Sequence, residues 1–443
     1  MPPAPPRRSS RSARGAAWAA LVVIAITGCS AARPWINPPL PADAVVRYDG
    51  LRQLTDPARA PDLLVVASFS GGGSRAAAFA HAALAELDRR RFVWDGRDTS
   101  LAGEIDMVTG VSGGSVAAAH LVLNGLRAHL DRFGPDFLDI DFQSRLVGAA
   151  LSPSNLHRMT SPWYGRGHVL AAELDALLFD GATFATLDAL PARPYLVIGA
   201  TDLASGADFD FASDQFASLC SAIDAVPLSF AVAASSSVPL VFSPLTLANH
   251  SKDCGRARSP APATDTADGI TAANARDRMV RAELDAVRGG GRRFVHLVDG
   301  GLSDNLGLRR IADYVAQAGG VVPVLSLLGS RRADALPRRV VFLSINAERR
   351  GPRAIDDRDS TPGAIDVLGA MIEGSLGRFS RETALVFADT IDAWRRELRA
   401  APGARPDADV FLVEIDLSDV ADTALRERVL AIPTAFRIAA PDR

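Results

Sequence analysis

The most constraining feature of the sequence is a repeated unit, in which a short apolar run leads into a glycine-rich turn and then an alanine-rich stretch. The first unit has its apolar run at residues 63–69, its glycines at 71–73 and its helical stretch at 74–87. The second has its run at 105–109 and its helical stretch at 116–130. Continuous apolar runs are typical of strands buried on both faces, and strands that alternate with helices predict a mostly parallel sheet covered on both sides. The expected fold is a three-layer α/β sandwich.

Other parts of the chain extend this pattern. Further apolar runs stand at residues 195–200, 294–298, 340–345 and 410–415. A hydrophobic fraction of 48% with 22% charged residues supplies the apolar surface for a large core. Residues 255–278 and 329–339 show little apolar periodicity, so they are expected to be irregular surface excursions.

The N-terminal 28 residues have the parts of a secretory signal peptide, with Arg7, Arg8, Arg11 and Arg14 ahead of an apolar run. That run, residues 16–26, is shorter than the roughly 20 residues needed to span a bilayer, so cleavage is the better interpretation.

Residues 26–29 resemble the lipobox of bacterial lipoproteins, which implies cleavage before Cys29 and lipid attachment to it. An ordinary secretory peptide with a chance cysteine is the alternative. In such lipoproteins a residue like Ser30 usually permits sorting to the outer membrane. The expected location is therefore the cell envelope, with the protein lipid-anchored at the outer membrane and facing the periplasm.

Residues 29–57, rich in Pro and Ala, are interpreted as a tether between lipid and domain. Three cysteines allow one disulfide with one sulfur left over, and outside the cytoplasm Cys220 and Cys254 are expected to pair. A metal site at His250 and Cys254 is the alternative, but no further ligand pair stands at a fitting spacing, so no metal is expected.

The charge balance limits the partners. The 48 basic and 51 acidic residues give a net charge of -3. This charge creates no positive electrostatic field that would attract a polyanion, so nucleic acid is excluded as a partner. Loss of the signal-peptide arginines makes the remaining chain more acidic, so membrane contact is expected to depend on the lipid anchor. No protein partner can be inferred.

A serine motif follows the run at 105–109. Gly110, Ser112 and Gly114 form Gly-x-Ser-x-Gly, which is a weak signal alone. Its place between a strand and a helix is that of a nucleophile elbow, where flanking glycines leave room for a strained serine. The helix N-terminus would then favour negative charge on the reacting groups. A glycine-rich helix start with a capping serine is the alternative.

The first glycine-rich turn contains Gly71, Gly72 and Gly73, whose consecutive N–H groups are suited to an oxyanion hole. The same turn satisfies a dinucleotide fingerprint at Gly71, Gly73 and Ala76, with Asp95 about 20 residues further on. That alternative leaves the serine elbow unexplained.

Two charged residues adjoin such turns. Arg75 opposes the dipole of the helix it begins, so it either binds an anionic or carbonyl group, as a substrate-positioning residue, or points outward. Asp299 follows the run at 294–298 and precedes Gly300 and Gly301. Enzymes built on sheets form their sites at the carboxyl ends of strands, so this position indicates a functional carboxylate. A turn-forming role is the alternative. Asp304 is expected to cap the helix that follows.

Together the three motifs resemble, in residues and in order, those of the patatin-like phospholipase family, in its bacterial lipoprotein type. The Ala-Ser-rich segment 233–239 and the stretch 161–167 agree with this resemblance, which covers residues 63–308. The domain then spans residues 58–443, with 309–443 as a C-terminal extension. Two departures, Ser70 for an acidic residue and Ala76 for Gly, bear on substrate fit more than on catalysis.

The resemblance implies a Ser-Asp dyad without histidine and without a cofactor. Ser112 would attack an ester of a phospholipid or lysophospholipid, Asp299 would accept its proton, and Gly113 would join the first glycine turn in holding the oxyanion. An α/β-hydrolase triad would need a histidine after the acid, but the last histidine, His296, precedes Asp299. Other hypotheses are a catalytically silent lipid- or partner-binding lipoprotein and, less favoured, a dinucleotide-binding protein.

Overall fold

The computed structural model describes residues 30–41, 62–190, 193–252, 272–288, 291–332, 336–349, 355, 357 and 359–438. The predicted signal peptide, the lipid-attachment residue Cys29 and Cys254 lie outside these residues and stay predictions. No helix among the described residues combines the length and apolar character that a membrane crossing needs.

The centre of the fold is an eight-stranded sheet with the order β10-β9-β1-β4-β5-β8-β7, in which β6 also pairs with β5. The strands are β1 Leu63–Phe69, β4 Ile105–Val111, β5 Tyr195–Asp202, β6 Asp208–Phe211, β7 Leu245–Ala248, β8 Phe294–Asp299, β9 Arg339–Asn346 and β10 Asp409–Asp416. The neighbours from β10 to β5 are all parallel, whereas β6 and β8 run antiparallel to β5. The prediction of a mostly parallel sheet is therefore confirmed. A separate hairpin pairs β2 Arg91–Trp94 with β3 Arg97–Ser100.

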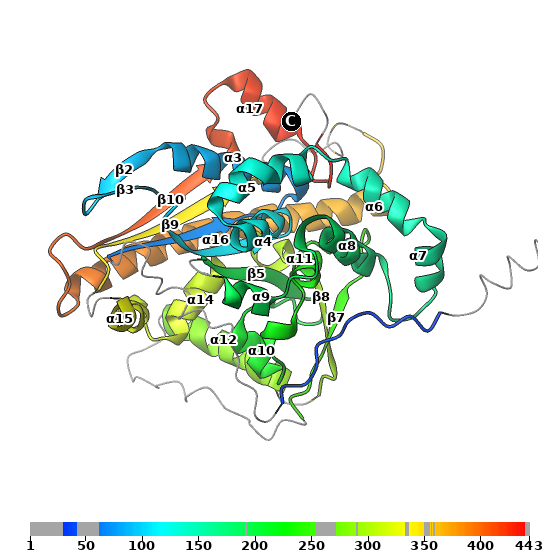
Figure 1. Ribbon diagram of the computed structural model, residues 1–443, viewed down its shortest axis with the longest axis horizontal. Helices are drawn as coiled ribbons and strands as arrows, with labels where there is room; N and C mark the ends of the chain where they lie inside the picture. Colours follow the sequence, from blue (N-terminus) through cyan, green and yellow to red (C-terminus); the bar gives the residue numbers. More distant parts are fainter. Residues whose placement is uncertain are drawn as a thin grey trace, which may run out of the picture.

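Helices cover both faces of the sheet (Figure 1). The larger apolar core draws side chains from α3 Gly73–Arg89, α4 Gly113–Asn124, α5 Leu126–Phe133, α6 Phe142–Ala150, α8 Arg166–Leu174, α9 Phe184–Ala189, α10 Ser213–Ser218 and α11 Leu228–Ser235. The second core draws them from α14 Arg309–Gln317, α15 Val321–Arg332 and α16 Ala364–Ala400. The remaining α-helices are α7 Pro153–Arg158, α12 Ala272–Arg288, α13 Gly301–Asp304 and α17 Thr423–Ala431. The layers are those of the expected α/β sandwich.

The structure corrects two boundaries. The single helix predicted over 116–130 is two helices, because Gly125 adopts a φ of 81° between α4 and α5, a conformation that glycine tolerates best. The irregular excursion predicted over 255–278 ends early, because α12 begins at Ala272.

The segment predicted to be a tether is attached to the domain over residues 30–41. Asn37 exchanges two hydrogen bonds with the backbone of Ala248, at 3.0 and 2.7 Å, and Trp35 packs edge-on against Phe230. The Leu40 N–H donates to the carbonyl of Cys220, and Cys220 itself is disulfide-bonded. Its predicted partner, Cys254, lies outside the described residues.

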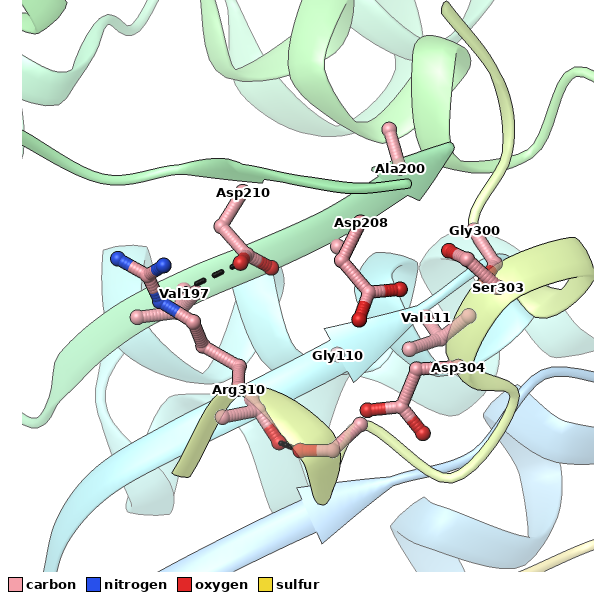
Figure 2. Close-up of a pocket in the computed structure, with 13 residues that line it drawn as sticks. Gly110, Val111, Val197, Ala200, Asp208, Asp210, Gly300, Ser303, Asp304 and Arg310 are labelled. Carbon is pink, nitrogen blue, oxygen red and sulfur yellow. Dashed lines mark hydrogen bonds and ion pairs between the residues drawn. The ribbon is translucent and has the colours of Figure 1, made fainter. Parts of the chain in front are cut away.

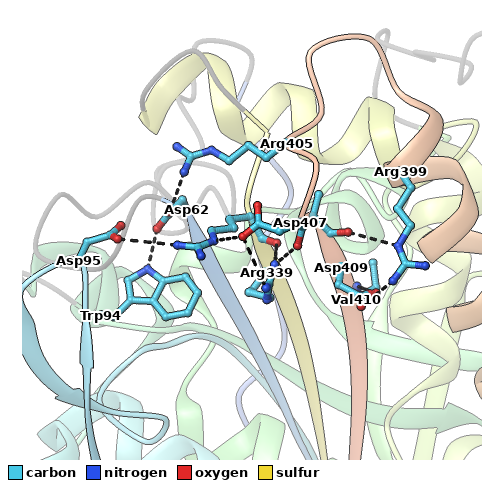
Figure 3. Close-up of polar contacts among 11 residues, drawn as sticks. Asp62, Trp94, Asp95, Arg339, Arg399, Arg405, Asp407, Asp409 and Val410 are labelled. Atoms are coloured by element: carbon cyan, nitrogen blue, oxygen red, sulfur yellow. Dashed lines mark hydrogen bonds and ion pairs between the residues drawn. The ribbon is translucent and has the colours of Figure 1, made fainter.

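The residues after 308, predicted to be a C-terminal extension, contribute two strands to the central sheet. Strand β9 pairs along all seven residues of β1, and β10 pairs along β9. A polar network at the N-terminal ends of these strands (Figure 3) joins them to the hairpin, with Asp62 accepting from the Trp94 indole at 2.7 Å and pairing with Arg405. In the same network Arg338 pairs with Asp407 at 2.5 Å. This network lies at the opposite end of the sheet from the glycine-rich turns.

Three histidines gather in the larger core. The rings of His81, His120 and His129 surround Phe133, and the Nδ1 atoms of His120 and His129 lie 3.1 Å apart. Burial lowers the pKa of all three imidazoles, that of His120 to about 4 and that of His129 further still. These histidines are therefore neutral in the folded protein and serve as packed core residues.

We expect this cluster to make the protein acid-sensitive. The unfolded chain protonates its histidines near pH 6.5 and the folded chain does not, so stability falls as the pH drops below about 6.5. The measurement is the free energy of unfolding in urea at pH 7 and at pH 5. Between these two pH values, the double variant His120→Leu/His129→Leu should lose less unfolding free energy than the wild type, by about 2 kcal/mol for each replaced histidine. The exposed His157→Leu is the control, and an equal loss in all three proteins would contradict the expectation.

Candidate active site

Ser112 stands in a strained turn between β4 and α4. Its φ of 50° and ψ of -123° are unusual for a residue with a side chain, and such conformations cost about 1–3 kcal/mol. The neighbouring glycines are required by space: a Cβ on Gly113 would collide with the Gly73 carbonyl, and one on Gly114 with the Phe69 carbonyl. The backbone thus has the shape of a nucleophile elbow.

The serine side chain meets the aspartate predicted to be its partner. Ser112 Oγ donates to Asp299 Oδ2 at 2.8 Å, and both residues are buried. The Gly301 N–H donates to the other oxygen, Asp299 Oδ1, at 2.8 Å and so fixes the carboxylate. Because β8 runs antiparallel to β5, the carboxyl ends of β4 and β8 approach each other.

The site makes Asp299 a stronger base than an ordinary aspartate. Burial raises the pKa of its carboxyl to about 6, and the hydrogen bonds from Gly301 and Ser112 oppose this rise. A carboxylate with that pKa is ionised at neutral pH and holds a proton better than a solvated one.

Ser235, at the end of α11, holds the two catalytic loops together. Its Oγ accepts the Ser112 N–H at 2.8 Å and donates to the Gly199 carbonyl at 2.5 Å. Its own carbonyl accepts the N–H of Gly300, beside Asp299. The Ala-Ser-rich segment singled out in the sequence therefore positions Ser112, a role that its composition did not indicate.

The glycines predicted to form the oxyanion hole divide into two groups. The Gly71 N–H donates to the Asn305 carbonyl at 3.0 Å, so this glycine supports the turn and the prediction that it binds an oxyanion is not supported. Within the described residues the N–H groups of Gly72, Gly73 and Gly113 make no hydrogen bond, and Gly73 and Gly113 each begin a helix. These three remain as candidate donors.

Arg75 binds carbonyl groups, as one of its two predictions expected, but these belong to the protein's own backbone. It is buried, and its guanidinium donates to the Ala347 carbonyl at 3.0 Å, to the Ile432 carbonyl at 2.5 Å and to Thr434 Oγ1 at 3.2 Å. Burial and nearby Arg349 lower its pKa to about 10, so it stays charged at neutral pH. The prediction of a substrate-positioning arginine is corrected: its donors fasten the C-terminal segment.

That segment, residues 432–438, lies against the first glycine-rich turn. The Ala435 carbonyl accepts the Ser74 N–H at 2.8 Å, and a Cβ added to Gly73 would come within 2.5 Å of the same oxygen. Residues far beyond the three motifs therefore form part of the wall of the site.

Behind the elbow a small pocket holds buried carboxyls, of which the sequence predicted a role only for Asp304. Figure 2 shows Asp208, Asp210 and Asp304 together with Arg310. Burial raises the pKa of each carboxyl, that of Asp304 to about 7, and Arg310 pairs with Asp210 at 3.3 Å. Asp304 also accepts the Arg309 N–H at 2.7 Å at the start of α14. The N-cap of that helix is Leu308, so the predicted capping role of Asp304 is limited to this one hydrogen bond.

Alternative chemistries find little geometric support. Asp95, the acid of the dinucleotide fingerprint, lies in the β2–β3 hairpin near Arg338, at the end of the sheet opposite Gly73. No group of His, Cys, Asp and Glu among the described residues is arranged to hold a metal ion.

Fold and site together define an α/β protein with a nucleophile elbow whose serine is paired to a buried aspartate. The model of the patatin-like phospholipases matches residues 67–311, which is more than half of the sequence. The chain belongs to the patatin-like phospholipase family.

Comparison with solved structures gives distant likenesses. Human GIVD cytosolic phospholipase A2 aligns with 12% identity and a TM-score of 0.32, covering 68% of this chain and 48% of that one. Its complex with methyl gamma-linolenyl fluorophosphonate aligns with 11% identity and a TM-score of 0.37, covering 89% and 59%. The chain thus spans about half the length of these proteins. No curated protein matches the chain.

Replacement of Arg75 should separate a structural role from contact with substrate. We expect Arg75→Ala to lose about 3 kcal/mol of unfolding free energy, because buried carbonyls of the C-terminal segment lose a charged donor. Chemical denaturation measures the loss, with the exposed Arg127→Ala as control. A rise in KM with unchanged stability would instead indicate contact with substrate.

Proposed function

We propose that the protein is a serine lipid acyl hydrolase that cleaves carboxylic ester bonds of phospholipids or lysophospholipids. The observation that carries the proposal is the 2.8 Å hydrogen bond from Ser112 Oγ to Asp299 Oδ2 in a strained, buried elbow. Membership of the patatin-like phospholipases supports a lipid substrate.

In the proposed acylation step, Ser112 Oγ attacks the ester carbonyl as its proton passes to Asp299 Oδ2. The carbonyl oxygen becomes an oxyanion, stabilised by the N–H groups of Gly72, Gly73 and Gly113 and by the N-terminus of α4. When the intermediate collapses, the bond to the alcohol oxygen breaks, and the alcohol leaves with the proton held by Asp299. The acyl group stays on Ser112.

In the proposed deacylation step, water takes the place of the departed alcohol. The water oxygen attacks the acyl carbonyl while Asp299 accepts a proton from the water. The same N–H groups that stabilise the first oxyanion stabilise the second. Its collapse releases the fatty acid and returns the proton from Asp299 to Ser112 Oγ. The dyad is thereby restored without a histidine or a cofactor.

The proposed function includes a location. We propose that Cys29 carries a lipid anchor in the cell envelope, which would keep the enzyme beside its substrates. Two or more acyl chains hold a protein at a bilayer stably, whereas one chain does so only marginally.

The proposed dyad can be tested by substitution. Ser112→Ala should lower fatty-acid release from lysophosphatidylethanolamine roughly a thousandfold, and Asp299→Asn roughly a hundredfold or more, because nucleophile and base are removed in turn. Asp98→Asn, on the exposed hairpin, is the matched carboxylate control and should keep full activity. A wild-type chain that releases no more fatty acid than Ser112→Ala would favour a silent lipid-binding protein.

The pH dependence tests the base. Only the ionised carboxylate of Asp299 can accept the serine proton, and burial raises its pKa to about 6. The value of kcat/KM should therefore fall about tenfold per pH unit below pH 6 and level off above pH 7. A profile with its midpoint near pH 4, that of a solvated aspartate, would contradict this role.

A further inference from the structure

Large apolar side chains are exposed around α6 and α7. We call this set the apolar face, and its members are Val147, Leu151, Leu156, Trp163, Leu240 and Val241. Leu151 is 64% exposed, Leu240 57% and Trp163 46%. Val147 and Leu151 are four residues apart, which is about one helical turn. Their side chains therefore lie on the same side of the helix, at the C-terminal end of α6. Grouped apolar exposure of this kind marks an interaction surface.

Hydrogen bonds hold the segments of the apolar face side by side. Asn155 of α7 donates to the Ala149 carbonyl of α6 at 2.9 Å, and the Tyr164 hydroxyl bonds to Asn155 at 3.4 Å. Arg166, three residues after Trp163, donates to the Leu240 carbonyl at 2.7 Å. The three parts of the chain that carry these side chains are therefore joined to one another.

The described N-terminal segment starts at this face. The Ser30 N–H donates to Thr160 Oγ1 at 2.9 Å, and Ser161 Oγ donates to the Ala32 carbonyl at 2.7 Å. Figure 1 shows this segment in dark blue, starting below α7 at the right-hand side and running toward the lower middle of the picture. Ser30, which directly follows Cys29 in the sequence, therefore lies beside the apolar face.

Arginines border the same face although the whole chain is acidic. The Arg33 guanidinium lies 3.2 Å from the centre of the Trp163 ring, and that of Arg158 lies 5.0 Å from the centre of Tyr164. Arg166 is exposed next to them. Aromatic and aliphatic side chains bordered by cations match the interface of a bilayer, where acyl chains lie below anionic phosphates.

The apolar face adjoins the candidate active site through the C-terminal segment. The Phe436 ring packs edge-on against Phe142 at the start of α6 and against Phe242, next to Val241. The preceding residue, Ala435, contacts the glycine-rich turn. A lipid at this face is thus one short segment away from the proposed oxyanion donors.

We propose that the apolar face is the surface by which the protein lies on a lipid bilayer, independently of its acyl anchor. Trp163, Leu151 and Leu240 enter the headgroup region, and the bordering arginines contact lipid phosphates. The inference rests on the proposed function in taking the bilayer as the source of substrate. It assigns the membrane-facing side of the molecule, which neither the family nor the dyad specifies.

The test is flotation of residues 30–443, which contain every described residue and lack Cys29, with vesicles of phosphatidylethanolamine and phosphatidylglycerol. The triple variant Leu151→Ser/Trp163→Ser/Leu240→Ser should lower the partition coefficient at least about tenfold, since three apolar side chains leave the interface. The control triple, Val93→Ser/Leu203→Ser/Leu425→Ser, removes exposed apolar side chains from other surfaces and should float like the wild type.

Hydrolysis of a soluble p-nitrophenyl ester separates this proposal from the proposed function. Equal activity in the three proteins, together with weaker flotation of the first triple variant only, supports the apolar face as the bilayer surface. Equal flotation in all three overturns it, as does a self-association in solution that only the first triple variant abolishes. Flotation as expected without ester hydrolysis by the wild type would instead contradict the proposed function.

Discussion

The hydrogen bond between Ser112 and Asp299 joins the ends of two strands that point toward each other, and much of the surrounding structure holds those ends in place. The elbow is strained at Ser112, and it needs glycine at 113 and 114 because the Gly73 and Phe69 carbonyls pass where their side chains would stand. Removal of the carboxylate from water has a chemical consequence, because it raises the pKa of Asp299 into the range of a useful base.

The matched family region, residues 67–311, contains the motifs but not the whole of their support. Strands β9 and β10 complete the sheet beside β1, and the segment 432–438 closes over the first glycine-rich turn through Arg75 and Ala435. At the other end of the chain, the segment from Ser30 lies against the α7–α8 connection. The C-terminal segment thus packs at the start of α6, through Phe436 and Phe142, and the N-terminal segment packs after α7.

Much of the fold could be predicted, because buried strands such as β1 and β9 are continuous apolar runs. The contact between Ser112 and Asp299 could be predicted as well, because each residue stands at the end of such a run. The direction of β8 could not, since the composition of a strand does not encode its pairing. Contacts such as Arg75 with Ile432 join distant parts of the chain without a local pattern. The roles of Ser235 and of Gly71 depend on hydrogen bonds to residues far along the chain, which motif spacing does not determine.

The central claim is that Ser112 is an activated nucleophile. Its most direct test is reaction of the protein with a fluorophosphonate, followed by mass spectrometry of the peptides. The account predicts one adduct, on the peptide that contains Ser112, with no adduct in Ser112→Ala and a much slower reaction in Asp299→Asn. An unmodified Ser112, or modification of a different serine at the same rate in Ser112→Ala, would contradict it.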